Sequence, residues 1–113
     1  TILASEDTMQ QCSDICFREV DFVRVKGRQE PVRIYEPLDL INSITPEQEQ
    51  RIIEHREALT AYYSGNWELA CQLFDRLYKR DNDPLHRIYL QRMEQVSLHA
   101  PPNWDGVFTH TSK

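Results

Sequence analysis

Three cysteines and four histidines are the residues best suited to metal binding or redox chemistry. Cys12 and Cys16 are four residues apart and could share a helix face, but no Cys or His partner at metal spacing completes a site. An odd cysteine count without a secretory signature indicates reduced thiols in a cytosolic setting. Exposure statistics place all four histidines on the surface, His55, His86, His99 and His110. We therefore predict no metal site.

The charge of the chain argues against a nucleic-acid surface. The formal net charge is −5, and both residues 1–38 and residues 39–113 carry more acidic than basic groups. Arg24, Lys26, Arg28 and Arg33 are close in sequence but are not interleaved with exposed aromatic residues. The apolar runs are far shorter than the ~18 residues that would span a bilayer, so we expect no membrane contact.

The first third of the chain reads as a short helix followed by a β-hairpin. Ser5 can cap a helix that runs to about Ser13, with acidic residues in its first turn. Residues 17–26 are rich in β-branched and aromatic types, and residues 32–36 alternate apolar with charged side chains, so both predict strands. Gly27 breaks the first strand, and Pro37 is expected to end the second. A two-stranded hairpin is marginal alone, so these strands need a larger sheet.

The remainder reads as three helices. Thr45 and Pro46 give a capped start to the first, which ends at the turn formed by residues 64–66. The second begins at Trp67, and the third begins near Pro84 and is expected to end at Pro101. Helical spacing predicts that Trp67 and Phe74 are packing residues. Trp104 and Phe108 follow the helices without periodic support, so they must find a groove in the helical module, in the preceding domain or in another subunit.

The hairpin resembles the closing hairpin of class III adenylate and guanylate cyclase catalytic domains. The resemblance is carried by the order strand, Val25-Lys26-Gly27, strand, Tyr35-Glu36, and residues 2–6 look like the strand end and helix start that precede it. It covers roughly the first third of the chain. It implies a parent enzyme that converts ATP or GTP to the cyclic nucleotide and pyrophosphate at a dimer interface, with a cytoplasmic catalytic domain and, in some members, membrane anchors upstream.

Lys26 matches the lysine that contacts the nucleotide triphosphate in this family. An ammonium at a strand end can stabilise charge that develops on phosphate oxygens. Without the resemblance, a solvated lysine beside a turn would be the simpler interpretation. The metal-binding aspartates and base-selecting residues of the family lie upstream, so Mg²⁺ or Mn²⁺ is expected in the parent and no cofactor in this chain. The chain alone is therefore expected to be inactive.

The helical part is similar to the tail that follows this domain in many bacterial cyclases, and Gly65-Asn66-Trp67 with Ala70 and Phe74 looks like the centre of a tetratricopeptide repeat. We predict an α+β chain: residues 1–38 end a ferredoxin-like cyclase domain, 39–45 form a linker, and 46–113 form a tetratricopeptide-like module with an extended aromatic C-terminus. The alternative is a non-catalytic helical interaction module. ATP versus GTP preference and the sensory input stay open.

Overall fold

The computed structural model describes residues 3–24, 30–96 and 99–109. It is an α+β structure, which confirms the coarse prediction, and it separates into two compact units. We call residues 1–50 and 107–113 the sheet unit and residues 51–106 the helical unit. The sequence predicts domain boundaries near residues 38 and 46, which differ from the limits of these two compact units. The predicted domain boundaries stay a prediction.

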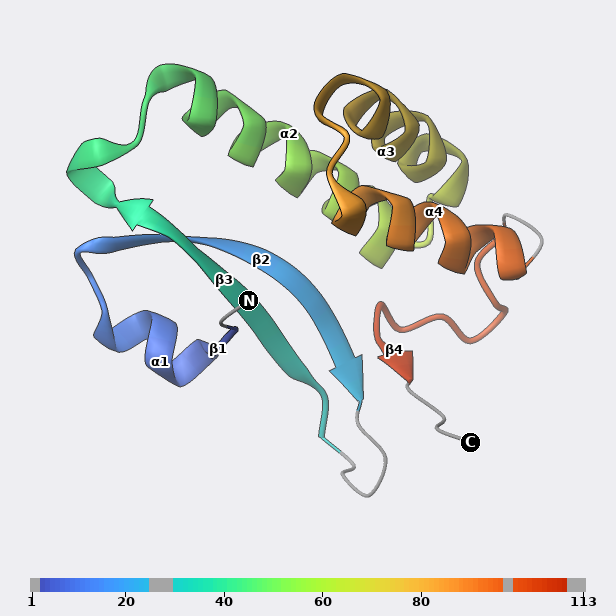
Figure 1. Ribbon diagram of the computed structural model, residues 1–113. Coiled ribbons are helices and arrows are strands. Elements are labelled where there is room, and N and C mark those ends of the chain that lie inside the picture. Colours follow the sequence, from blue (N-terminus) through green and yellow to red (C-terminus); the bar gives the residue numbers. More distant parts are fainter. Residues whose placement is uncertain (1–2, 25–29, 97–98, 110–113) are drawn as a thin grey trace. The chain divides into compact units, whose positions relative to one another are not determined.

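The sheet unit is built on a long antiparallel hairpin (Figure 1). Its strands are β2, Ile15–Arg24, and β3, Val32–Leu40. The strand β1, Ala4–Ser5, pairs antiparallel with β3, and β4, Phe108–Thr109, pairs parallel with β2, giving the strand order β1-β3-β2-β4. The helix α1, Glu6–Gln11, follows β1, and the Ser5 side chain accepts a hydrogen bond from the Thr8 amide, so the predicted cap is confirmed.

The prediction that Pro37 ends the second strand is wrong. β3 continues to Leu40, and Pro37 lies opposite Phe17 next to a register shift between Cys16 and Phe17. Proline lacks a backbone N–H and is tolerated in strands at such irregularities. The short 3₁₀ helix η1, Ile41–Ser43, then leads to the first long helix.

Local capping explains the starts and ends of the helices. The helix α2 spans Pro46–Tyr63, and Thr45 and Gln48 exchange side-chain-to-amide hydrogen bonds of 3.1 and 2.9 Å as a capping box. At its other end, Gly65 adopts a φ of 87°, and the amides of Gly65 and Asn66 donate to the carbonyls of Tyr62 and Ala61. This is a Schellman motif, in which glycine avoids the steric cost of a left-handed backbone.

Two further helices complete the helical unit. The helix α3, Trp67–Asp81, is capped by the Asn66 side chain and ends at Asn82 in the left-handed region. The helix α4, Pro84–Gln95, is capped by Asp83 and has proline in its first turn. It ends at Gln95, so the prediction that the prolines at 101 and 102 stop it is wrong. The chain leaves the helix at Val96, whose φ of −111° and ψ of 28° are not helical and whose amide donates to the Met93 carbonyl.

The buried hydrophobic cluster belongs to the helical unit. It is centred on Tyr62, Phe74 and Tyr89, and the Phe74 and Tyr89 rings stack with their centroids 4.8 Å apart. Along β2 and β3, by contrast, Val23 is the one buried apolar side chain among the described residues. The two units therefore differ sharply in how much core each contains.

Candidate functional site

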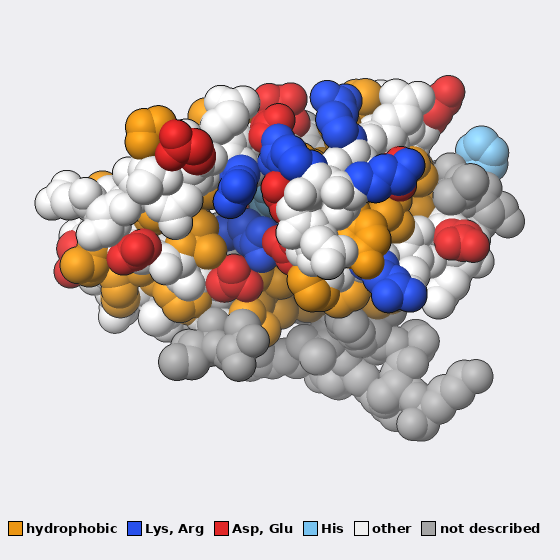
Figure 2. Space-filling model, turned by 45° about the horizontal axis from the view of Figure 1, so that its top comes forward, with side chains coloured by type: hydrophobic (Ala, Val, Ile, Leu, Met, Phe, Trp, Pro, Cys, Tyr) orange, Lys and Arg blue, Asp and Glu red, His pale blue; other side chains and the backbone are white. Residues whose placement is uncertain are grey.

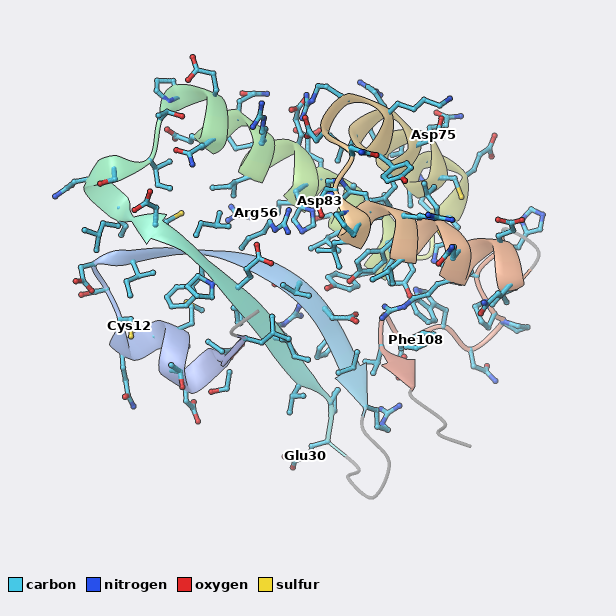
Figure 3. All side chains as sticks on the ribbon, in the orientation of Figure 1. Cys12, Glu30, Arg56, Asp75, Asp83 and Phe108 are labelled. Atoms are coloured by element: carbon cyan, nitrogen blue, oxygen red, sulfur yellow. The ribbon has the colours of Figure 1, made fainter. Side chains whose placement is uncertain are left out.

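Lys26, the predicted triphosphate contact, lies outside the described residues, as do its neighbours Val25, Gly27 and Arg28. The chain enters this segment from Arg24 at the end of β2 and emerges at Glu30, which Figure 3 places at the far tip of the hairpin. Val23 and Val32 are the last described partners before the tip. The described part of the hairpin therefore ends on either side of the predicted contact, and the role of Lys26 stays a prediction.

Charged side chains along the hairpin form pairs across the two strands. Arg18 binds Glu36 at 3.2 Å, and Arg33 binds Glu19 at 2.9 Å. The Arg33 guanidinium also lies over the Phe22 ring, 4.1 Å from its centroid. Such pairs across neighbouring strands contribute to pairing and register. Arg18 and Arg33 are thus engaged with carboxylates of the sheet unit, which makes them poor candidates for binding a phosphate.

Tyr35 lies among carboxylates on the same hairpin. Burial raises the pKa of its hydroxyl above the ordinary value, and the nearby charges of Glu19 and Glu6 raise it further. A negative environment stabilises the neutral phenol. The hydroxyl of Tyr35 is therefore in its neutral, protonated form at neutral pH.

The structure places Trp67 and Phe74 in the core of the helical unit, with 3% and 0% of their surface exposed. Trp104 packs within that unit as well. Its ring meets those of Tyr62 and Trp67 edge to face, with ring centroids 5.2 Å apart in each case, and its indole N–H donates to the Tyr62 carbonyl. The groove expected for Trp104 is thus supplied by the helical module itself, the first of the three possibilities. Whether any of these aromatic residues also packs against a partner stays a prediction.

Phe108 lies on β4 in the sheet unit (Figure 3). It pairs with Val23 of β2. The residue before it, Val107, is 6% exposed. Sequence reasoning expected an extended segment here but did not find its strand partner. A strand of two residues is too short to show an alternating pattern. Its parallel partner lies more than eighty residues earlier in the chain, so the sequence does not predict this pairing.

The prediction that His55 and His86 are surface residues is wrong. They are 2% and 3% exposed, and Nδ1 of His55 lies 2.9 Å from Nε2 of His86. The helical spacing would have predicted burial, whereas the exposure statistics predicted a surface position. His55 falls three residues after Ile52 and four before Leu59, on the face that α2 buries. His86 precedes Tyr89 and Met93 in the same way on α4. His99 is exposed, and His110 is outside the described residues.

The three cysteines are free and half-buried. Burial raises the pKa of the Cys71 thiol, and the neighbouring Asp75 raises it further. Its sulfur lies 3.6 Å from that of Met93, inside the helical unit. A thiol held in its neutral form is a weak nucleophile. Cys71 is therefore a packing residue.

A groove of about 490 Å³ lies between α2 and α3. Its wall includes Ile53 and Leu69, whose side chains are 42% and 41% exposed, and the polar groups of Arg56 and Glu57 border it. Among the described residues, no group of three His, Cys, Asp or Glu side chains could hold a metal ion. In the same part of the chain, no helix is both long enough and apolar enough to cross a membrane.

Comparison of the chain with protein-family models, with characterised proteins and with solved structures found no match.

Proposed function

We propose that this chain is the C-terminal portion of a class III nucleotidyl cyclase, which converts ATP or GTP into the 3′,5′-cyclic nucleotide and pyrophosphate. The observation that carries the proposal is the sparse core of the sheet unit. β2 and β3 contain β-branched and aromatic residues, yet only Asp21 and Val23 of these strands are buried, and Leu38 and Leu40 are exposed. Apolar strands of this kind need a sheet or helices to cover them. A parent catalytic domain would supply that cover.

The order of local elements supports the same proposal. A strand end at Ala4–Ser5, a capped helix, and two antiparallel strands follow one another in the order that the resemblance implies. The ferredoxin-like topology of the whole domain is part of the proposal, because it requires strands beyond those described.

Lys26 is the residue of this chain that would act in the reaction. Its ammonium group would contact the triphosphate and stabilise the negative charge that develops on the departing pyrophosphate. Mg²⁺ or Mn²⁺, held by aspartates elsewhere in the parent domain, would supply the charge stabilisation and alignment that a two-metal site provides. The described residues offer no carboxylate group suited to hold these ions. We therefore expect the 113-residue chain alone to be inactive.

The remaining parts of the proposal concern partners and location. The parent would act as a homodimer through its catalytic domain, in the cytoplasm, with ATP or GTP as its substrate. Nucleic acid is not a proposed partner, because Lys and Arg side chains are interspersed with Asp and Glu on the face shown in Figure 2, and the net charge is −5.

Replacing the lysine in the full-length protein tests this role. Lys26→Ala should lower turnover by ~10- to 1000-fold at saturating nucleotide, in line with loss of one charge-stabilising contact. Lys79→Ala is the matched control, because Lys79 is an exposed lysine of α3 whose partner is Asp75 one helical turn away, and it should leave turnover unchanged. Unchanged turnover in Lys26→Ala would reject the proposed contact.

The helical unit is proposed to be a tetratricopeptide-like tail that serves packing, dimerisation or regulation of the parent. The turn at Gly65, the capping Asn66 and the buried Trp67, Ala70 and Phe74 support this assignment. Deleting residues 45–113 from the parent should change solubility, dimerisation or regulation before it changes the chemistry. A truncated dimer identical to the intact one in all three would make the tail a passive appendage.

A second candidate is a non-catalytic helical interaction module. The groove between α2 and α3, with exposed Ile53 and Leu69, favours it. Repeat proteins normally need about three units to build a stable binding surface, and this chain contains about one and a half. This candidate predicts that the full-length protein forms no cyclic nucleotide, which separates it from the first.

A further inference from the structure

His55 and His86 form a buried pair that joins two helices of the helical unit. His55 lies on α2 and His86 in the first turn of α4. Their facing nitrogens are 2.9 Å apart, their ring centroids are 5.1 Å apart, and the rings are tilted by 40°. At this distance one nitrogen donates and the other accepts, so a single proton lies between the two rings.

The surroundings of the pair combine an apolar floor with a charged border. The Phe74 ring lies 5.7 Å from that of His86, and Ala58 and Tyr89 lie within one helical turn of the two histidines in the buried cluster. The charged groups at this end of the unit come from all three helices and their caps: Arg51 and Glu54 from α2, Arg80 and Asp81 from α3, and Asp83 from the start of α4.

This charged border is itself paired. Arg80 binds Glu54 at 2.7 Å and Asp81 at 2.8 Å, and Arg51 lies 3.8 Å from Asp81. The pKa of Asp81 is lowered chiefly by its hydrogen bond with Arg80, and His86 contributes a smaller part. Asp81 can therefore favour one positive charge on the histidine pair, but its own arginine partners already offset its charge.

Protonation of the pair has two steps with different consequences. One added proton can leave the hydrogen bond in place, because an imidazolium still donates to a neutral imidazole. A second added proton puts two N–H groups face to face and two positive charges in a buried site, which is costly without further compensation. In the unfolded chain, each histidine takes up its proton independently near pH ~6.5.

We propose that His55 and His86 form a pH-sensitive latch, which holds α4 against α2 at neutral pH and loosens as the pH falls below ~6. The direction follows from proton counting. Below pH ~6.5 the unfolded chain binds two protons at these positions, whereas the folded latch binds at most one. The stability that the latch contributes is therefore complete above pH ~6.5 and is lost progressively as the pH falls.

Urea unfolding of the 113-residue chain between pH 7.5 and 5.5, followed by the circular dichroism of the helices, tests the latch. Between pH 6.5 and 5.5 the unfolding equilibrium constant should rise by roughly tenfold. Glutamine does not titrate, so His55→Gln and His86→Gln should each flatten this rise. His99→Gln, at an exposed position, is the matched control and should retain the full rise. A rise in both latch variants equal to that of the unsubstituted chain would overturn the proposal.

If a variant fails to fold, proton uptake by the unsubstituted native chain tests the latch instead. The imidazole signals in an NMR titration should show fewer than two protons taken up by His55 and His86 together while the helices remain folded, with His99 as internal reference. Uptake of two full protons by a pair that stays folded at pH 5.5 would also overturn the proposal.

Discussion

Trp67 and Trp104 donate their indole N–H groups to the same acceptor, the carbonyl oxygen of Tyr62, at 3.0 and 2.9 Å. Their rings meet edge to face, with centroids 5.2 Å apart. Tyr62 lies in the last turn of α2, where carbonyl groups lack partners within the helix. The two indoles therefore complete the end of α2 and attach the segment after α4 to it.

Replacing Trp104 by phenylalanine should lower the free energy of unfolding of the helical unit by about 1 kcal/mol. The change keeps most of the ring contact with Tyr62 and Trp67 but removes one hydrogen bond, and the Tyr62 carbonyl keeps its other donors. Urea unfolding monitored by circular dichroism measures the loss. Asn103→Ala, at an exposed neighbouring position, should change the free energy by less than ~0.5 kcal/mol. Equal effects of the two changes would contradict this role of the indole.

Gly65 and Gly106 offer a matched pair for measuring a close backbone approach. Both have left-handed backbones, with φ of 87° and 86°. A Cβ at position 65 would meet the Trp104 ring at an ordinary 3.5 Å, whereas a Cβ at position 106 would lie 3.2 Å from the backbone oxygen of Tyr63. Alanine at either position should cost ~1 to 2 kcal/mol for the backbone alone.

Gly106→Ala should therefore lower the melting temperature more than Gly65→Ala, because only the former adds a contact with backbone that cannot move aside easily. Differential scanning calorimetry of both variants makes the comparison. A larger loss in Gly65→Ala would mean that the segment leading to β4 relaxes freely around position 106.

The features predicted correctly from the sequence are those set by neighbouring residues. The Ser5 cap, the Thr45 capping box, the Gly65 turn and the Asp83-Pro84 helix start all depend on side chains within a few positions of each other. These local interactions stop and start helices regardless of what packs on them. The sequence therefore placed the helix starts and the turn between α2 and α3 well.

The features missed from the sequence depend on residues distant along the chain. Pro37 stays within β3 because the partner strand shifts its register opposite it, and β4 exists only because β2 offers its edge. His55 and His86 are buried because each satisfies a ring nitrogen of the other across 31 positions. The pattern of residues within one helix does not predict a partner on another helix.

Asp81 should contribute to stability at neutral pH. Its hydrogen bond with Arg80 holds its pKa below the ordinary value of 3.8, so its contribution is present above that value and is lost as the pH falls through the lowered pKa. At pH 7, Asp81→Asn should lower the free energy of unfolding by ~0.5 to 1 kcal/mol. Urea unfolding at pH 7 and below pH 3 should show this difference and then its disappearance.

Asp75→Asn is the control for the Asp81 variant. Asp75 lies on α3 (Figure 3). It binds Lys79 one helical turn away on an exposed face, and a pair of this kind contributes only ~0.3 to 0.5 kcal/mol. A loss at pH 7 in Asp75→Asn as large as that in Asp81→Asn would show that the network of Arg51, Glu54 and Arg80 adds nothing beyond a single exposed pair.

The two units should differ in amide hydrogen exchange in the 113-residue chain. Amides of α3 lie beside the buried cluster around Phe74 and Tyr89, whereas those of β2 and β3 are on strands with few buried side chains. Protection reflects the free energy of local opening, so the β2 and β3 amides should exchange ~10-fold or more faster than those of α3. Equal protection would mean that the hairpin is already stable without further strands.

The measurement that tests the account most directly is cyclic nucleotide formation by the full-length protein that contains this chain. With ATP or GTP and Mn²⁺, the intact protein should release cyclic nucleotide and pyrophosphate in equal amounts, and the 113-residue chain alone should release neither. A folded full-length protein that forms no cyclic product from either nucleotide would contradict the account.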